Sequence, residues 1–211
     1  MEEGIPSTTA IASAMVRAAH LLWDDEPKIF EDPLALKLCG AQSESGLRAQ
    51  FDRIEAQFAP IAGPGYTTMM RRFSVPIVVM RSRYLEDEVD HAVERGVSQY
   101  AILGAGLDSF AYRRTDLANS LRVFEVDHPA TQAWKRARLQ QIRITLPSNL
   151  VLVPVDFEKQ SLIERLQKND YHVDQPGLFS WLGVTPYLTL EAIFGTLRSV
   201  AAFAPGTEIM F

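Results

Sequence analysis

Cysteine is almost absent from this sequence, and so are two other features that define specialised classes of protein. Cys39 is the only cysteine, so the chain cannot form an internal disulfide, and no cysteine–histidine cluster has the spacing of a metal site. No stretch approaches the ~20 apolar residues that a membrane-spanning helix needs. We therefore expect a protein of the reducing cytoplasm, with no bound metal and no membrane partner.

An excess of basic residues is also missing. The formal net charge is −5, whereas a dedicated nucleic-acid-binding protein usually carries a basic surface, so we expect no nucleic-acid partner. Apolar residues make up 47% of the chain and charged residues 22%, which is typical of a soluble globular protein. The 211 residues suffice for one ordinary domain with a substantial core.

The first 95 residues are predicted to be mostly helical. Ser7 or Thr8 can cap a helix that ends near Pro27, because apolar residues recur along it at spacings of three and four. Further helices are expected from about residue 33 to 39 and from about 75 to 95, with a break at 63–65. We interpret residues 1–95 as an N-terminal helical cap that is part of the same domain as the remaining chain.

From residue 96 onward, short apolar runs alternate with helical patterns. Strands are expected at residues 100–103, 121–126, 150–154, 177–182 and 207–211, and helices at 129–142, 161–168 and 190–202. This alternation predicts an α/β fold with a doubly wound, mostly parallel sheet. Because the chain stops inside the fifth strand, we expect residues 96–211 to be a core truncated in strand 5, with its C-terminal strands missing.

A glycine-rich turn follows the first expected strand. Gly104, Ala105 and Gly106 lie between this strand and a helix, which is the context of a nucleotide-binding turn, and glycine permits close approach of the backbone to a ligand. Ser109 replaces the third glycine of the dinucleotide pattern, and the charge of Asp108 would repel a pyrophosphate. A cationic ligand therefore fits better than NAD, although such a turn can also be purely structural.

Acidic residues end the second and third expected strands. Asp127 lies 21 residues after Gly106, where an acid can accept hydrogen bonds from both ribose hydroxyls; the alternative is that it caps the helix beginning at Pro129. Asp156 is in position to accept from an adenine amino group, with Phe157 packed beside the base. The alternative for Asp156 is an ordinary loop acid.

Arg81 interrupts the apolar side of its helix, between Val78 and Leu85. A guanidinium that faces inward needs an anionic partner. The carboxylate of a methionine moiety is one candidate, and a structural salt bridge with Asp32 is the other.

No residue is assigned a catalytic role. His20 and His128 are candidates for a general base, but a lone histidine is more often structural. Tyr66, Trp181 and Tyr187 can either line an acceptor pocket or pack in the core.

These residues together resemble the leucine carboxyl methyltransferase family, and most closely its bacterial, actinobacterial-type branch of S-adenosyl-L-methionine-dependent methyltransferases. The resemblance spans nearly the whole chain. The segments that carry it are Ser7-x-Thr9-Ala10, Arg17-Ala18, Asp32-Pro33-Leu34-Ala35, Gly104–Asp108 with Tyr112-Arg113, Phe124–Pro129 and Trp181–Leu188.

The resemblance implies a Rossmann-like class I methyltransferase fold that binds S-adenosyl-L-methionine. Arg81 would hold the methionine carboxylate, Asp127 the ribose and Asp156 the adenine, and the glycine turn would pass beneath the methionine and ribose. The predicted cofactor-binding residues are Arg81, Gly104, Ala105, Gly106, Asp127, Asp156 and Phe157. One departure is Leu182, which stands where many relatives carry a glutamate near the methionine amino group.

The predicted function is that of a methyltransferase acting on a carboxyl or hydroxyl oxygen of a small-molecule acceptor. The alternatives are an NAD(P)-dependent oxidoreductase and a catalytically silent protein that binds the cofactor. The sequence does not indicate the acceptor or an oligomeric state.

Overall fold

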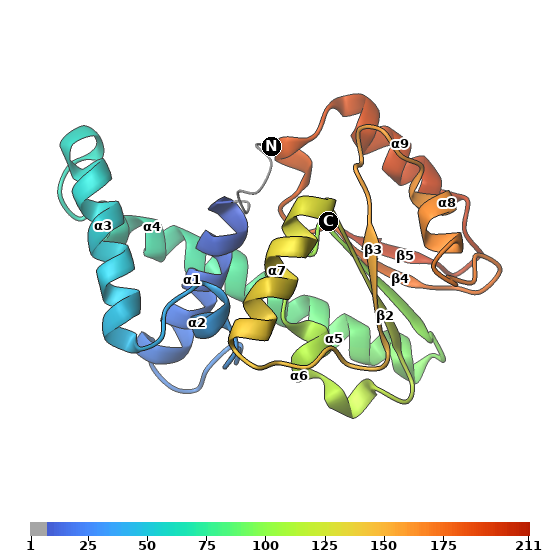
Figure 1. Ribbon diagram of the computed structural model, residues 1–211, viewed down its shortest axis with the longest axis horizontal. Coiled ribbons are helices and arrows are strands. Elements are labelled where there is room, and N and C mark those ends of the chain that lie inside the picture. Colours follow the sequence, from blue (N-terminus) through green and yellow to red (C-terminus); the bar gives the residue numbers. More distant parts are fainter. Residues whose placement is uncertain (1–7) are drawn as a thin grey trace. The chain divides into compact units, whose positions relative to one another are not determined.

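The structure, a computed structural model, describes residues 8–211 (Figure 1). The described chain divides into two compact units. The helical unit comprises residues 8–86 and 107–109, and the core unit comprises residues 87–106 and 110–211. Ser7, proposed above as a helix cap and as part of a family motif, lies outside the described residues.

The helical unit consists mostly of helices, as the sequence predicts. They are α1 (Thr8–Trp23), α2 (Ala35–Leu38), α3 (Glu44–Ala62), α4 (Tyr66–Val75), a π-helical turn (Pro76–Met80) and the first part of α5 (Arg81–Glu94). The predicted break at residues 63–65 separates α3 from α4. Met15 and Ala18 are buried in α1 as the spacing predicts, but Leu22 is exposed, so the apolar side of α1 is shorter than expected.

The core unit is built on a sheet of five strands. They are β1 (Gln99–Leu103), β2 (Arg122–Asp127), β3 (Leu150–Pro154), β4 (Leu178–Ser180) and β5 (Glu208–Met210). The strand order is β3-β2-β1-β4-β5, and every neighbouring pair is parallel. This arrangement confirms the predicted α/β fold with a doubly wound sheet.

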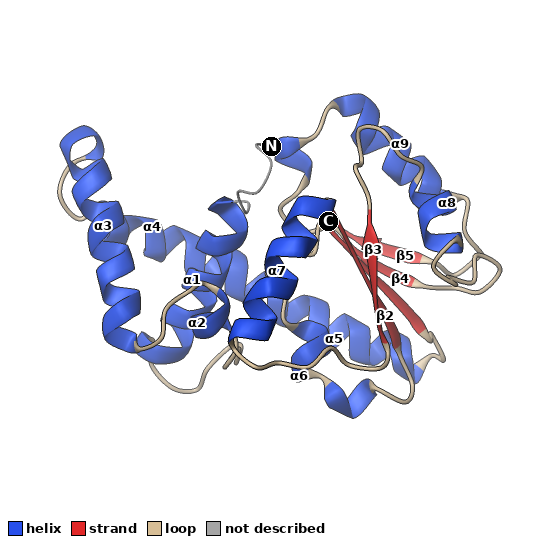
Figure 2. Cartoon of the chain, viewed as in Figure 1, coloured by secondary structure: helices blue, strands red, loops and turns tan. Residues whose placement is uncertain are grey.

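Helices cover both faces of this sheet. They are α6 (Phe110–Arg113), α7 (Pro129–Gln141), α8 (Leu162–Gln167) and α9 (Leu190–Ala201), with 3-10 turns at Thr115–Leu117 and Thr185–Tyr187. Figure 2 shows α6 and α7 on one side of the sheet and α8 and α9 on the other. All five residues of β1 are buried, as expected of a central parallel strand covered on both faces.

Aromatic side chains fill much of the core between the sheet and helices α8 and α9. Tyr171 lies against Phe124, Phe179 and Phe203, with ring centroids 5.0, 5.7 and 5.3 Å away. Such packing makes the sheet a rigid support for the loops at its edge. Within residues 8–211, no helix is both long and apolar enough to cross a membrane.

Candidate functional site

The strand order places the candidate site residues of the core unit at one edge of the sheet. β1 lies between β2 and β4, so the direction of winding reverses at β1, and ligands of open α/β sheets bind beyond the carboxyl ends of the strands at such a point. The glycine turn follows β1, Asp127 ends β2, and Asp156 follows β3 by two residues. The sheet therefore brings these three predicted segments to the same edge.

The glycine turn has a backbone that favours glycine. Gly104 and Gly106 have φ angles of 68° and 49°, in the left-handed region that residues with a side chain rarely adopt. The amides of Gly104 and Ala105 both donate to the carbonyl of Val126, over 2.7 and 3.1 Å. A Cβ atom on Gly104 would overlap the side chain of Val184. The turn is thus fixed against the end of β2, and Val184 fills the space beside the Gly104 Cα.

Asp127 connects this turn to the second strand. Its Oδ2 accepts a hydrogen bond from the Gly106 amide at 2.5 Å, and its Oδ1 accepts from the His128 amide at 2.6 Å. The residue is half-buried, and each carboxylate oxygen keeps a second lone pair. Burial raises the pKa of Asp127, although the two amide donors act in the opposite direction. The carboxylate is therefore held in place with capacity for two further donors.

The cap of α7 is not Asp127 but the next residue. The Nδ1 atom of His128 accepts a hydrogen bond from the Ala130 amide at 3.3 Å, which satisfies an unpaired donor at the start of the helix. The sequence alternative that made Asp127 a helix cap therefore does not describe this chain. His128 has a structural contact of its own.

Asp156 and Phe157 lie in the loop after β3. Partial burial would raise the pKa of Asp156, but hydrogen bonds from Lys159 and from the Glu158 amide outweigh it and hold this pKa below its ordinary value. The Lys159 Nζ lies 3.0 Å from the Asp156 carboxylate. Phe157 packs on the core with its ring centroid 6.4 Å from that of Trp181. Asp156 is therefore an ionised hydrogen-bond acceptor next to the aromatic residue Phe157.

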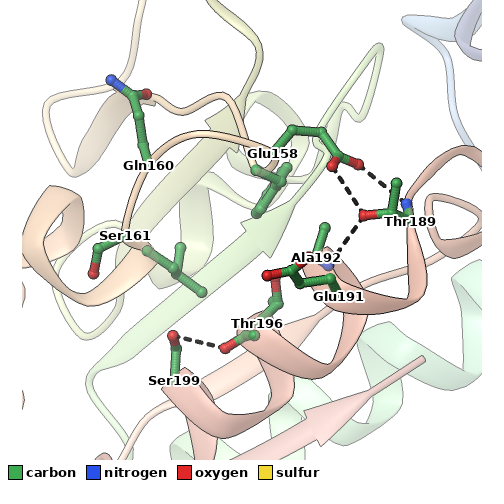
Figure 3. Close-up of a pocket in the computed structure, with 11 residues that line it drawn as sticks. Glu158, Gln160, Ser161, Thr189, Glu191, Ala192, Thr196 and Ser199 are labelled. Carbon is green, nitrogen blue, oxygen red and sulfur yellow. Dashed lines mark hydrogen bonds between the residues drawn. The ribbon is translucent and has the colours of Figure 1, made fainter.

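A cavity of about 340 Å³ lies next to this loop, between α8 and α9. Phe157 is the one predicted cofactor residue that lines it. Figure 3 shows Glu158 reaching Thr189, whose amide and hydroxyl donate to the carboxylate over 3.1 and 2.9 Å. The cavity is polar, and its hydroxyl-bearing residues are Ser161, Thr189, Thr196 and Ser199.

Arg81 lies in the helical unit, at the first residue of α5. Its guanidinium is half-buried, and burial together with repulsion from Arg17 lowers its pKa. Asp32, the alternative partner, instead accepts from Arg17 Nε at 2.8 Å and from the Ser109 hydroxyl at 2.7 Å. Across the described residues 8–211, no carboxylate or carbonyl pairs with Arg81. A half-buried cation in this state is a candidate to bind an external anion.

The buried network around Asp32 also positions the chain just after the glycine turn. Arg17 donates through Nη2 to the carbonyl of Leu107 at 2.7 Å, and the Ser109 hydroxyl donates to the same carboxylate that binds Arg17. Residues 107–109 therefore belong to the helical unit although they directly follow Gly106 in the chain.

The other candidates singled out above have structural contacts or an exposed position. His20 is buried and its Nδ1 lies 2.7 Å from Asp24. Trp181 is buried in the core, and Tyr66 stacks on Phe58 with ring centroids 5.0 Å apart. Tyr187 is exposed.

Sequence reasoning did not identify the contact between Val184 and Gly104, nor the role of Lys159 beside Asp156. Val184 belongs to a loop that approaches β1 only because β4 pairs with it, and no periodicity reports such a contact. The spacing of three residues between Asp156 and Lys159 was the available signal for their pairing.

Comparison with known proteins connects this geometry to a family. The sequence profile of the leucine carboxyl methyltransferase family matches residues 10–201. A Bacillus subtilis protein, YktD, is 31% identical over 220 residues, which cover 100% of this chain and 72% of that protein. A Frankia alni protein is 30% identical over 199 residues, covering 93% of this chain and 64% of that protein. Both carry the provisional name of S-adenosyl-L-methionine-dependent methyltransferase.

A solved structure supports the fold. The crystal structure of a Thermobifida fusca protein, provisionally titled a methyltransferase, aligns with a TM-score of 0.52 at 20% identity and covers 82% of this chain and 62% of that one. This likeness confirms the Rossmann-like methyltransferase fold. The chain spans about two thirds of the length of the proteins it matches.

Proposed function

The chain belongs to the leucine carboxyl methyltransferase family, whose cofactor is S-adenosyl-L-methionine, and we propose that it transfers a methyl group from this cofactor to an oxygen atom of a small molecule. The observation that carries the proposal is the glycine turn bonded to Asp127 at the winding reversal of the sheet. This pairing supplies a surface for close approach and an acceptor for ribose hydroxyls in one place.

The residues present fit the chemistry of the cofactor. Gly104 and Gly106 offer a backbone without side chains, and Asp127 retains two lone pairs for hydroxyl donors. The cationic Arg81 suits the methionine carboxylate, while Asp156 and Phe157 suit the amino group and the face of adenine. When bound, the cofactor supplies an electrophilic methyl group on a positively charged sulfur.

The protein's share of the catalysis is binding, orientation and exclusion of water. A carboxylate acceptor needs no general base, whereas a hydroxyl acceptor benefits from one. His20 and His128, the two histidines singled out for that role, both make structural contacts. Because a carboxylate needs no general base, this observation favours a carboxyl group as the methyl acceptor.

Calorimetric titration with S-adenosylhomocysteine tests the proposal, with NAD as the competing ligand. We expect binding to the wild type and its loss in Asp127→Ala, while the control Asp174→Ala, which removes an exposed acid in the core unit, binds normally. Preference for NAD would favour an oxidoreductase instead. Binding without transfer to any of a panel of carboxylic acids and alcohols would favour a silent cofactor-binding protein.

A further inference from the structure

The cavity between α8 and α9 is a second candidate site, and it lies wholly within the core unit. Its eleven lining residues all fall within residues 157–199. Its volume of about 340 Å³ is roughly ten times the ~30 Å³ that one water molecule occupies. At Gly195, which lines it, a Cβ atom would meet nothing within 4 Å. The cavity therefore has room for a small organic molecule.

One side chain of this cavity has an unused hydrogen-bonding group. Thr196 on α9 is 5% exposed, and its hydroxyl makes no hydrogen bond to any other group of residues 8–211. This hydroxyl is not among the fully enclosed polar atoms that lack a partner, so it opens on the cavity that Thr196 lines. A hydroxyl in so buried a residue costs free energy unless a molecule in the cavity pairs with it.

Two further hydroxyl groups of the cavity keep part of their hydrogen-bonding capacity. Figure 3 shows Ser161 at the start of α8 and Ser199 on α9. The Ser199 hydroxyl donates to the Gly195 carbonyl at 2.9 Å, and the Ser161 hydroxyl accepts from the Glu164 amide at 3.4 Å. Ser199 can still accept, and Ser161 can still donate. The cavity thus suits a ligand whose own hydroxyl groups both donate and accept.

The charge on the wall of the cavity is negative. Glu158 and Glu191 line it, and of the described residues that do so none is a lysine, arginine or histidine. Glu158 accepts from the amide and hydroxyl of Thr189 at the start of α9, and Glu191 belongs to the first turn of that helix. A helix N-terminus carries only about half a positive charge, so two carboxylates outweigh it. The cavity therefore disfavours an anion and favours a cation.

Nearby basic residues and metal binding do not change this conclusion. Lys159 lies 3.0 Å from the Asp156 carboxylate, and Arg198 is exposed on α9; neither lines the cavity. Nowhere in residues 8–211 do three or more histidine, cysteine, aspartate or glutamate residues form a group that could hold a metal ion. An organic cation is therefore the class of ligand that fits.

We propose that this cavity binds a small hydroxylated amine of the amino-sugar kind, and that it is separate from the cofactor site. The ammonium group would pair with the two carboxylates, and the hydroxyl groups would pair with the three side-chain hydroxyls that have unused capacity. The ring carbons would pack on Leu162 and Ala192, which form part of the wall. No cofactor contact enters this inference, so it does not depend on the proposed function.

Calorimetric titration with glucosamine at about pH 6, below the ordinary pKa of an amine, tests the assignment. Thr196→Val removes the unpaired hydroxyl with little change of shape. The matched control Thr131→Val removes the hydroxyl of another buried threonine of the core unit, on α7. We expect Thr196→Val to weaken glucosamine binding about fivefold and the control to change it less than about twofold. Circular dichroism verifies that both variants fold.

A second pair of variants tests the charge. Glu191→Gln removes a carboxylate of the cavity, and the matched control Glu164→Gln removes one from the first turn of α8, outside the cavity. We expect Glu191→Gln to weaken glucosamine binding about threefold or more and Glu164→Gln to change it less than about twofold. The wild type should bind glucose, which has no charge, more weakly than glucosamine, and Glu191→Gln should narrow that difference.

The same titrations give the results that would overturn the assignment. Equal affinity for glucosamine and glucose, or tighter binding of glucuronate, would contradict the preference for a cation. Equal losses in Thr196→Val and Thr131→Val would place the ligand outside the cavity. Displacement of glucosamine by S-adenosylhomocysteine would make the cavity part of the cofactor site. Glucosamine binding at Thr196 in a protein that does not bind S-adenosylhomocysteine would support this inference and contradict only the proposed function.

Discussion

Gly104 is subject to two separate constraints, and substitution can distinguish them. Its φ of 68° disfavours any side chain, and a Cβ would in addition overlap Val184. Gly96 has a φ of 91° with nothing within 4 Å of the corresponding position. We expect Gly104→Ala to lower the free energy of unfolding by more than Gly96→Ala, for which backbone strain of about 1 kcal/mol is the main cost. Chemical denaturation measures both.

A second substitution checks the steric part. Val184→Ala in the Gly104→Ala background should recover part of the lost stability, because it removes the methyl groups that the new Cβ meets. Equal losses in Gly104→Ala and Gly96→Ala would mean that the loop after β4 does not lie against the glycine turn.

The raised pKa of Asp127 predicts how cofactor affinity depends on pH. Burial raises the pKa of this carboxyl group in the free protein, and ribose hydroxyls donate to its ionised form. In the ligand-free protein, the contribution of Asp127 to the free energy of unfolding is fully present below the ordinary pKa. This contribution is lost as the pH rises through the raised pKa. Ligand affinity has the opposite pH dependence. It is highest above the raised pKa and weakens as the pH falls through that pKa.

Titrations with S-adenosylhomocysteine between about pH 4 and pH 8 measure this effect. Asp127→Asn should weaken binding about tenfold or more, since hydrogen bonds to a charged group are strong, and should remove the pH dependence. A wild-type affinity that stays constant over this range would contradict the raised pKa.

A buried ion pair connects strand β2 to helix α7. Lys135 Nζ lies 2.7 Å from the Glu125 carboxylate, and both side chains are at most 3% exposed. Lys135→Met removes this cation from a buried carboxylate, so we expect a loss of about 3–5 kcal/mol in unfolding free energy. Glu125→Leu/Lys135→Met should recover most of this loss.

The matched control is an exposed pair in the same unit. Arg95 and Glu208 lie 2.8 Å apart but are about half exposed, so Arg95→Met should cost less than ~1 kcal/mol. Similar losses for Arg95→Met and Lys135→Met would show that burial of the Lys135 pair does not set its energetics.

The periodic elements of this fold could be read from the sequence. The β3 bounds agree with the expected residues 150–154. Helices α7 and α9 differ from expectation by one residue at one end, and α8 differs by one residue at each end. The helix expected over 75–95 instead begins with a π-helical turn at Pro76–Met80. Pro76 lacks an amide hydrogen and interrupts the α-helical ladder, an effect that the apolar spacing does not report.

The site was predictable only in part, because its local and distant contacts leave different signals. The order of glycines and acids after successive strands indicated the turn and Asp127. By contrast, the pairing of Arg17 with Asp32 joins residues 15 positions apart, and the link from Ser109 to Asp32 spans 77. The sequence analysis named Arg81 as an alternative partner for Asp32, and the sequence carries no signal that would identify Arg17 as that partner.

On the scale of the whole molecule, cofactor binding should stabilise the fold. A ligand at about 100 times its dissociation constant adds ~2.7 kcal/mol to the free energy of unfolding. We expect S-adenosylhomocysteine to raise the melting temperature of the wild type but not of Asp127→Ala, as measured by scanning calorimetry. An equal rise in both would place the ligand away from Asp127.

A crystal structure of the protein with S-adenosylhomocysteine bound would show directly whether the cofactor binds at the glycine turn and Asp127. We predict ribose hydroxyls at the Asp127 carboxylate and the backbone of Gly104–Gly106 beneath the ligand. A ligand that occupies the cavity between α8 and α9 instead, with Asp127 free of contact, would contradict the assignment of the cofactor site.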